Sequence, residues 1–287
     1  MANLKEIRNR ISSVESTMQI TSAMKMVSAA KLKKAQDAII QLRPYADKLT
    51  EMLINLSSTL DGGEGNSYST IRQEKNILFV TITSNRGLCG GFNSNVIKKT
   101  KTLINEEYKD CHSSIMSIGK KSSEFFSKNN YNIISSHDEL FNNITFDQVS
   151  KIADTIMEGF REANYDKVIL VYNQFKNAAT QIIMCENYLP VETPDDNSEN
   201  IGDYIFEPTK EKIVNELIPK SLKTQIFKAI LDSHAAEHGA RMTAMHKATD
   251  NANDLKDDLT LHYNKARQAA ITGEILEIVG GAEALNG

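Results

Sequence analysis

Apolar residues near both ends of the chain follow a repeat of alternating three- and four-residue steps. In the N-terminal segment the repeat runs through Leu4, Ile7, Ile11, Val14, Met18, and again through Ala35, Ile39, Leu42, Ala46, Leu49, Leu53, Leu56 and Leu60. This is the a/d pattern of a coiled coil rather than the broader apolar stripe of a helix on a globular domain. No glycine precedes Gly62. The pattern therefore predicts one long N-terminal helix, bent at Pro44, whose ring removes a backbone hydrogen bond.

The repeat changes character in the middle of this helix. Polar residues occupy its positions at Thr21, Lys25 and Ser28, followed by a basic cluster of Lys31, Lys33 and Lys34. The apolar residues move to another face of the helix, at Ile20, Ala23, Met24, Val27 and Ala30. Two interpretations are open: a local irregularity of the coil, or an apolar and basic surface that faces a third partner.

The C-terminal segment carries a second repeat of the same kind. It runs through Met245, Ala248, Ala252, Leu255, Leu259, His262, Ala266, Ala269, Gly273 and Leu276. An earlier block, Leu222, Ile226 and Ala229, is out of phase with it, and Pro219 marks either a kink or a late helix start. Neither helix can bury its apolar positions alone. Pairing within one chain costs less loop-closure entropy than assembly from separate chains, so we expect an antiparallel two-helix coiled coil.

The central part alternates between strand-like and helix-like stretches. Short β-branched runs at 76–82, 114–119 and 167–172 are separated by helix-like sequence, and 181–185 could add an edge strand. This order predicts a Rossmann-like α/β domain with a parallel sheet and right-handed crossovers. The predicted parts are an N-terminal helix (1–60), a loop (61–75), an α/β domain (76–190), a linker rich in Pro, Asp and Asn (191–208) and a C-terminal helix (209–287).

Composition excludes several classes of protein. No apolar run is long enough to span a membrane, and the charged N-terminus lacks the apolar core of a signal peptide, so we expect synthesis and retention in the cytoplasm. The three scattered cysteines indicate a reducing compartment. Residues 1–60 carry nine Lys and Arg against five Asp and Glu, although the net charge of the chain is −4. The basic residues are not interleaved with aromatic ones, which argues against nucleic acid as a partner.

Two motifs suggest chemistry, and both have a simpler interpretation. The glycine-rich sequence 86–91 lies where a phosphate loop would, but it lacks the Gly-Lys-Ser/Thr ending and the G-x-G-x-x-G spacing. His234, Glu237 and His238 match H-x-x-E-H, yet a metal site needs a further ligand and an open pocket. We therefore predict no catalytic residue, no bound cofactor and no metal site.

Four separated segments resemble the gamma subunit of bacterial F-type ATP synthases. They are residues 5–8 with 20–32, the sequence Arg86-Gly87-Leu88-Cys89-Gly90-Gly91, residues 241–252, and residues 263–272 followed by Glu274 and Ile275. They occur in the order that the family shows and extend along the whole chain. Members of this family are the rotor shaft within a ring of three alpha and three beta subunits, where catalysis takes place on the beta subunits.

The resemblance implies partners and contact residues. It assigns contacts with the alpha/beta ring to Met24, Lys25, Arg241, Arg267, Gln268 and Thr272, and contacts with the epsilon subunit and the membrane rotor (c) ring to Tyr204, Phe206 and Glu207. Family members often carry an acidic residue where Lys25 stands. It further implies a peripheral location on the cytoplasmic face of the inner membrane. The alternative from the residues alone is an α/β nucleotide-binding enzyme with helical arms that dimerise it.

Overall fold

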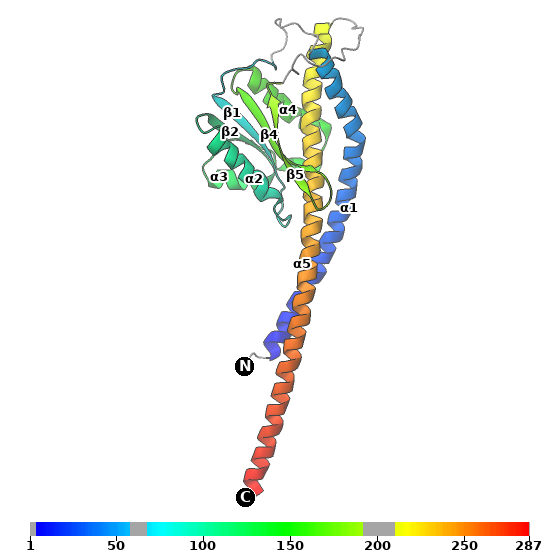
Figure 1. Ribbon diagram of the computed structural model, residues 1–287, viewed down its shortest axis with the longest axis vertical. Helices are drawn as coiled ribbons and strands as arrows, with labels where there is room; N and C mark the ends of the chain where they lie inside the picture. Colours follow the sequence, from blue (N-terminus) through cyan, green and yellow to red (C-terminus); the bar gives the residue numbers. More distant parts are fainter. Residues whose placement is uncertain (1–3, 58–67, 192–209, 287) are drawn as a thin grey trace. The chain divides into compact units, whose positions relative to one another are not determined.

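A computed structural model describes residues 4–57, 68–191 and 210–286 (Figure 1). The chain forms two compact units. One, here called the coil unit, comprises Met1–Ser28 and Met242–Gly287, and the other, the domain unit, comprises Ala29–Arg241. Two long helices, α1 (Leu4–Ser57) and α5 (Lys210–Asn286), each contribute residues to both units.

The domain unit contains a five-stranded sheet in the order β3-β2-β1-β4-β5. Its strands are β1 (Asn76–Ile82), β2 (His112–Ile118), β3 (Ile133–Ser136), β4 (Lys167–Phe175) and β5 (Gln181–Leu189). The first four are parallel, as predicted, and β5 pairs with β4 in the antiparallel sense as the edge strand. The short strand β3 was not predicted, because its sequence Ile-Ile-Ser-Ser does not alternate between apolar and polar residues and none of its residues is buried.

Helices cover both faces of this sheet. The remaining helices of the domain unit are α2 (Phe92–Thr102), continued by the π-helical turn η1 (Leu103–Glu107), α3 (Lys120–Lys128), the short 3-10 helix η2 (Glu139–Asn142) and α4 (Phe146–Arg161). One core lies between the sheet, α2, η1 and α3. A second core lies between the opposite face, α4 and α5. Because the central strand β1 is covered on both faces, its residues are almost uniformly apolar and buried.

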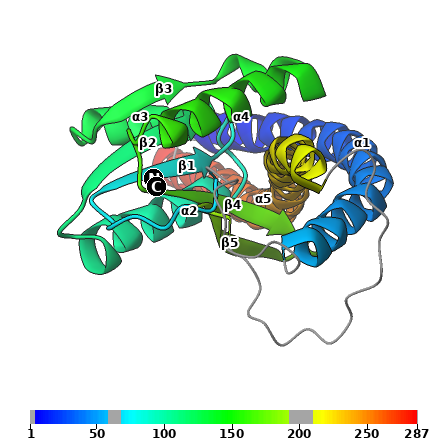
Figure 2. The same cartoon turned by 90° about the horizontal axis from the view of Figure 1, so that it is seen from above.

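The first half of α5 is a layer of this second core. Leu222, Ile226 and Ala229 are fully or nearly buried against side chains of α4, β1 and β4. Figure 2 shows this part of α5 with α1 on one side and strands β4 and β5 on another. The packing explains why these three residues are out of phase with the C-terminal repeat, since they face the sheet rather than α1. The helix begins at Lys210 and continues through Pro219, so a helix start at that proline is wrong.

In the domain unit α1 packs along α5 through its predicted repeat. Ala35, Ile39, Ala46 and Leu49 are buried, and so is Leu32, which the predicted repeat did not include. At the same interface the guanidinium of Arg43 lies 3.3 Å from the carboxylate of Asp232, and the ammonium of Lys220 lies over the ring of Tyr45. The helix also continues through the exposed Pro44.

In the coil unit the two helices are paired antiparallel, as predicted. Arg8 contacts Tyr263, Glu15 contacts Lys256, and Thr21 contacts Thr249. The residue numbers increase along α1 while those of the partners on α5 decrease, as antiparallel pairing requires. The α1 repeat is not interrupted, because Thr21 and Ser28 are buried at their repeat positions. Small hydroxyl side chains in the middle of the repeat therefore face α5, and the neighbouring apolar residues face outward.

One part of the predicted C-terminal repeat is wrong by a single residue. Met245 and Ala252 are buried as expected, but Leu255 is 49% exposed and Leu276 is 66% exposed. His262 and Ala269 are exposed as well. The intervening positions next to α1 belong instead to Thr249, Lys256 and Tyr263. Each of these polar residues has a polar partner on α1, and this pairing stabilises it at the interface. Hydrophobicity alone predicts Leu255 rather than Lys256 at the interface, which is why the sequence prediction was wrong by one residue.

Candidate functional site

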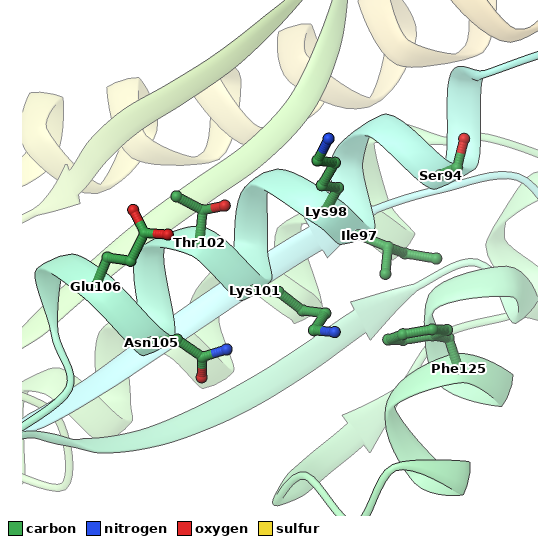
Figure 3. Close-up of a pocket in the computed structure, with 8 residues that line it drawn as sticks. All are labelled: Ser94, Ile97, Lys98, Lys101, Thr102, Asn105, Glu106 and Phe125. Atoms are coloured by element: carbon green, nitrogen blue, oxygen red, sulfur yellow. The ribbon is translucent and has the colours of Figure 1, made fainter.

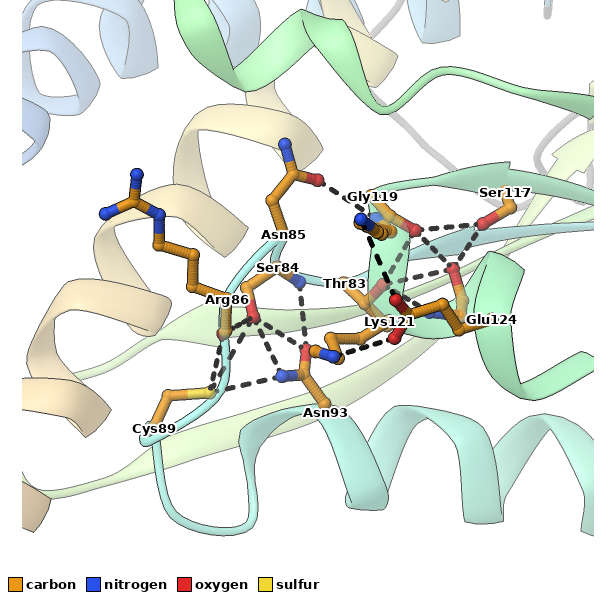
Figure 4. A network of polar contacts seen from close by, with 12 residues as sticks. Thr83, Ser84, Asn85, Arg86, Cys89, Asn93, Ser117, Gly119, Lys121 and Glu124 are labelled. Atoms are coloured by element: carbon orange, nitrogen blue, oxygen red, sulfur yellow. Dashed lines mark hydrogen bonds and ion pairs between the residues drawn. The ribbon is translucent and has the colours of Figure 1, made fainter.

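The loop that follows β1 is held by a network of polar contacts at its base (Figure 4). The Ser84 backbone N–H donates to Asn93 Oδ1 (2.9 Å), and Asn93 Nδ2 donates to Ser84 Oγ (2.8 Å) and contacts Cys89 Sγ (3.2 Å). Leu88 has a φ of 62° and its side chain is 63% exposed. A positive φ is rare for a bulky residue and costs about 1–3 kcal/mol. The surrounding bonds thus maintain a strained loop that presents an apolar side chain to solvent.

Arg241 of α5 fastens this loop from the other side. Its guanidinium donates to the backbone oxygens of Arg86 (3.2 Å) and Gly87 (3.4 Å), and it pairs with Glu237 at 2.7 Å. The Arg241 side chain is only 9% exposed. Burial raises the pKa of the Glu237 carboxyl, while the charge of Arg241 opposes that shift. The pair is a buried, charge-assisted connection between α5 and the loop.

The two histidines of the H-x-x-E-H sequence complete this cluster. His238 Nδ1 lies 3.3 Å from Arg241 Nη1, and the Nε2 atoms of His238 and His234 are 3.1 Å apart. Burial first, then nearby cations such as Lys31, lower the pKa of His234 to about 4; burial, His234 and the nearby cations lower that of His238 to about 3. A neutral His238 can accept from Arg241 at Nδ1 and donate to His234 at Nε2. The H-x-x-E-H sequence therefore stabilises the contact between α5 and the loop after β1, and Glu237 forms an ion pair with Arg241.

The position at which open α/β sheets usually bind ligands is filled by the chain itself. In this sheet order, that position lies at the carboxyl ends of β1 and β4, where the connections leave in opposite directions. Here Asn173 Nδ2 donates to the Phe92 backbone oxygen (3.0 Å), and Cys89 and Phe92 pack against Ala236 of α5. A Cβ at Gly239 would lie 3.3 Å from the backbone of Ala178, so α5 approaches the β4–β5 turn closely. This packing argues against the alternative of a nucleotide-binding enzyme.

A second polar cluster joins β1, β2 and α3 at the same edge of the sheet (Figure 4). Ser122 donates its backbone N–H to Thr83 Oγ1 (3.0 Å), and the hydroxyl groups of Ser117 and Ser122 contact each other. Gly119 has a φ of 106°, and a Cβ there would lie 2.0 Å from the Thr83 backbone oxygen. The buried hydroxyl groups satisfy one another, which indicates a structural role. Among the described residues, no group of three or more His, Cys, Asp or Glu side chains is arranged to hold a metal ion.

An open groove on the outer side of α2 is shown in Figure 3. It is lined by Ser94, Ile97, Lys98, Lys101, Thr102, Asn105, Glu106 and Phe125. The Lys101 ammonium lies 5.8 Å from the centre of the Phe125 ring. Two ammonium groups and an apolar floor give this open groove the character of a solvated surface.

The residues assigned to ring contacts fall into three groups. Met24 and Lys25 are half-buried on α1, and Arg267, Gln268 and Thr272 are exposed on α5, all within the coil unit. Arg241 belongs to the domain unit, and its guanidinium is bonded within the chain. Tyr204, Phe206 and Glu207 lie outside the described residues.

The coil unit exposes apolar residues on both helices. Ile20 and Val27, on the outward face of α1, are more than half exposed. Near the end of α5 the exposed apolar residues are Ile271, Ile275, Leu276, Ile278 and Val279. Since Arg8 faces Tyr263, this end of α5 continues past Leu4, the first described residue of α1, and these side chains have no facing helix among the described residues. The outward face of α1 was visible in the sequence, whereas the bonds of Arg241 to the loop had no sequence signal.

The fold and these features define the chain as a coiled-coil protein with an inserted α/β domain. A family model described as ATP synthase matches residues 3–285. The ATP synthase gamma chain of Flavobacterium johnsoniae is 62% identical over 288 residues, and that of Christiangramia forsetii is 58% identical over 287 residues, with 100% of both chains covered in each case. The chain belongs to the family of ATP synthase gamma chains.

Solved structures show the same fold. A chain of the Tetrahymena thermophila mitochondrial ATP synthase central stalk and c-ring is 26% identical, with a TM-score of 0.58, and the match covers 80% of this chain and 99% of that one. A chain of the Euglena gracilis mitochondrial ATP synthase is 23% identical, with a TM-score of 0.73 and coverage of 98% and 94%. Within the described residues, no helix has an apolar stretch long enough to cross a bilayer.

Proposed function

We propose that this chain is the rotor shaft of an F-type ATP synthase. It turns within a ring of three alpha and three beta subunits and couples ion movement to ATP synthesis or hydrolysis on the beta subunits. The chain itself is non-catalytic, contacts the epsilon subunit and the membrane rotor ring, and is peripheral to the cytoplasmic face of the inner membrane. Family membership, and the central-stalk title of the Tetrahymena structure, support this proposal.

The observation that carries the proposal is the unequal exposure of the coil unit. Its exposed apolar residues include Ile20, Met26 and Val27 on α1 and Leu255, Leu261 and Ile271 on α5, interspersed with exposed polar residues, so the surface of the unit is not uniform. A rotating shaft changes the conformation of the surrounding subunits only if its contacts with them change with the angle of rotation. A partner that binds two conformations with equal affinity does not shift the equilibrium between them.

The proposed ring contacts are Met24, Lys25, Arg267, Gln268 and Thr272. Three of them are exposed, and all five lie in the coil unit. Arg241 has a different proposed role: it positions the loop after β1, because its donors are engaged within the chain. The foot contacts Tyr204, Phe206 and Glu207 rest on the family resemblance alone.

The test is assembly followed by measurement of coupling. The chain is combined with alpha and beta subunits of a related bacterial enzyme, and ATP hydrolysis and rotation of a bead attached to the exposed Cys185 are recorded. We expect assembly, rotation, and no hydrolysis by the isolated chain. Hydrolysis by the isolated chain, or failure to enter the ring, would contradict the proposal.

A double substitution tests the assigned contacts. Arg267→Ala with Gln268→Ala removes exposed side chains, so it should slow the assembled complex while leaving the melting temperature of the isolated chain unchanged. Lys265→Ala, two residues before Arg267 and also exposed, is the matched control. Equal losses of turnover and stability would show that Arg267 and Gln268 have a structural role.

A further inference from the structure

Three polar contacts, here called the register contacts, join the helices of the coil unit at regular intervals. Arg8 Nη2 donates to the Tyr263 hydroxyl (2.6 Å), Lys256 Nζ pairs with Glu15 Oε1 (3.0 Å), and Thr249 Oγ1 donates to Thr21 Oγ1 (2.8 Å). The guanidinium of Arg8 also lies 5.6 Å from the centre of the Tyr263 ring. Successive contacts are about one heptad apart on both helices, so all three belong to a single antiparallel alignment.

The apolar packing of this unit does not select that alignment by itself. Its buried apolar residues, among those described, are Ile7, Met245 and Ala252. Along α1 the repeat positions from Leu4 to Met18 are all apolar, and along α5 the positions at heptad spacing, from Ala252 to Gly273, are small or apolar. A displacement by one heptad, about 10 Å, therefore puts similar residues against each other.

The charged residues distinguish the alignments. If α1 is displaced by one heptad in one direction, Arg8 faces Lys256, and two cations are brought together. In the other direction Arg8 faces Ala270 and Glu15 faces Tyr263, so Arg8 loses its acceptor and Glu15 loses its cation. Polar residues at a helix–helix interface are known to specify register at some cost in stability.

We propose that the register contacts fix the axial offset between α1 and α5, and thereby the levels at which α1 and α5 present their partner contacts. The effect on partner contacts rests on the proposed function. Met24 and Lys25 lie on α1 and Arg267 and Gln268 on α5, so the offset between the helices sets the axial distance between these two groups of proposed contacts. The residues of the register contacts are positioning residues: they act by aligning other side chains.

The alignment is measured in the isolated chain by disulfide formation. Thr21→Cys and Thr249→Cys, in a background with Cys111→Ser and Cys185→Ser, place two thiols where hydroxyl oxygens lie 2.8 Å apart. We expect rapid cross-linking. Adding Glu15→Lys should reduce the cross-linking yield at least fivefold, and adding Lys256→Glu as well should restore it. Thr17→Lys, which introduces the same side chain at an exposed position of α1, is the matched control and should leave the yield unchanged.

The consequence is measured in the assembled complex as protons pumped per ATP hydrolysed. Glu15→Lys should lower this ratio. Oxidation of the two engineered thiols to a disulfide by an added mild oxidant, during the remaining native-register encounters, should restore it until a reductant is added. An unchanged cross-linking yield in Glu15→Lys would overturn the proposal. So would a loss of coupling that neither the charge swap nor the disulfide restores, since Glu15 would then act on a partner directly. Failure of the unsubstituted chain to assemble would instead contradict the proposed function, and the cross-linking result would stand.

Discussion

His234 and His238 are neutral because of where they lie. Both rings are held beside Arg241 and near Lys31, and their pKa values fall to about 4 and about 3. In the unfolded chain both return to the ordinary value of 6.5. The unfolded state therefore binds more protons below pH 6.5, and the stability that the neutral rings contribute is present above that pH and lost as the pH falls toward 4.

We expect His234→Gln with His238→Gln to flatten the decline in stability between pH 6.5 and pH 4. Each pKa unit corresponds to about 1.4 kcal/mol, so the wild-type chain should lose several kcal/mol more than the variant over this range. Glu237 contributes with the opposite sign, because its raised pKa makes protonation favour the folded state. Urea unfolding at several pH values measures the difference, and parallel curves for the two proteins would contradict the assignment.

The strain at Leu88 gives a second prediction at this scale. Leu88→Gly should stabilise the isolated chain by about 1 kcal/mol, because glycine adopts a positive φ without penalty. Ala163 has a φ of 60° in an exposed turn, so Ala163→Gly is the matched control and should stabilise similarly. Only Leu88→Gly should slow the assembled complex. Equal turnover in the two variants would show that the Leu88 side chain contacts no partner.

Between elements, the contact of α1 with α5 in the domain unit contains a buried carboxylate. Asp232 is fully buried, and its Oδ2 atom has no hydrogen-bond partner among the described residues, while Oδ1 pairs with Arg43. Burial raises the pKa of Asp232, and Arg43 opposes the shift. Arg43 is therefore the main compensation for a carboxylate that has been removed from water.

Arg43→Met should cost about 1–3 kcal/mol at pH 7, because it leaves the Asp232 charge buried without its ion-pair partner. The double variant with Asp232→Asn should recover most of this loss. Arg161→Met breaks an exposed pair with Glu158 and should cost less than about 0.5 kcal/mol. Chemical unfolding of the four proteins decides the matter, and equal effects of Arg43→Met and Arg161→Met would refute the argument.

Periodicity predicted the elements well where burial alone controls the sequence. The α1 repeat and strands β1, β2 and β4 follow from apolar spacing, and the antiparallel pairing follows from that spacing together with the entropy of closing the central loop. The prediction was wrong where a polar pair replaces an apolar one, as at Lys256, whose partner Glu15 lies on a distant segment. It also gave no explanation for Leu222, Ile226 and Ala229, because their partner is the sheet. The bonds of Arg241 to two backbone oxygens leave no mark in the sequence.

At the scale of the whole molecule, the proposed function depends on exposed surfaces such as the end of α5. Truncation after Lys265 removes the exposed end of α5, and no residue of this end is among the described residues that form the two cores of the domain unit. The truncated chain should retain the cooperative unfolding of the domain unit, while the assembled complex should pump fewer protons per ATP hydrolysed. Calorimetry and vesicle acidification measure the two quantities. Unchanged coupling would contradict the contacts assigned to Arg267, Gln268 and Thr272.

The burial of α5 against the sheet determines which fragments of this protein can fold in isolation. Strands β1 to β5 with α2, α3 and α4 look like an independent domain when the chain is read linearly. Yet Ile218, Leu222, Ile226 and Ile230 supply part of its interior from a distant segment. A fragment ending at Leu189 would expose the apolar face of the sheet to solvent and should aggregate on expression. Co-expression with residues 210–241 as a separate peptide should cover this face and keep the fragment soluble.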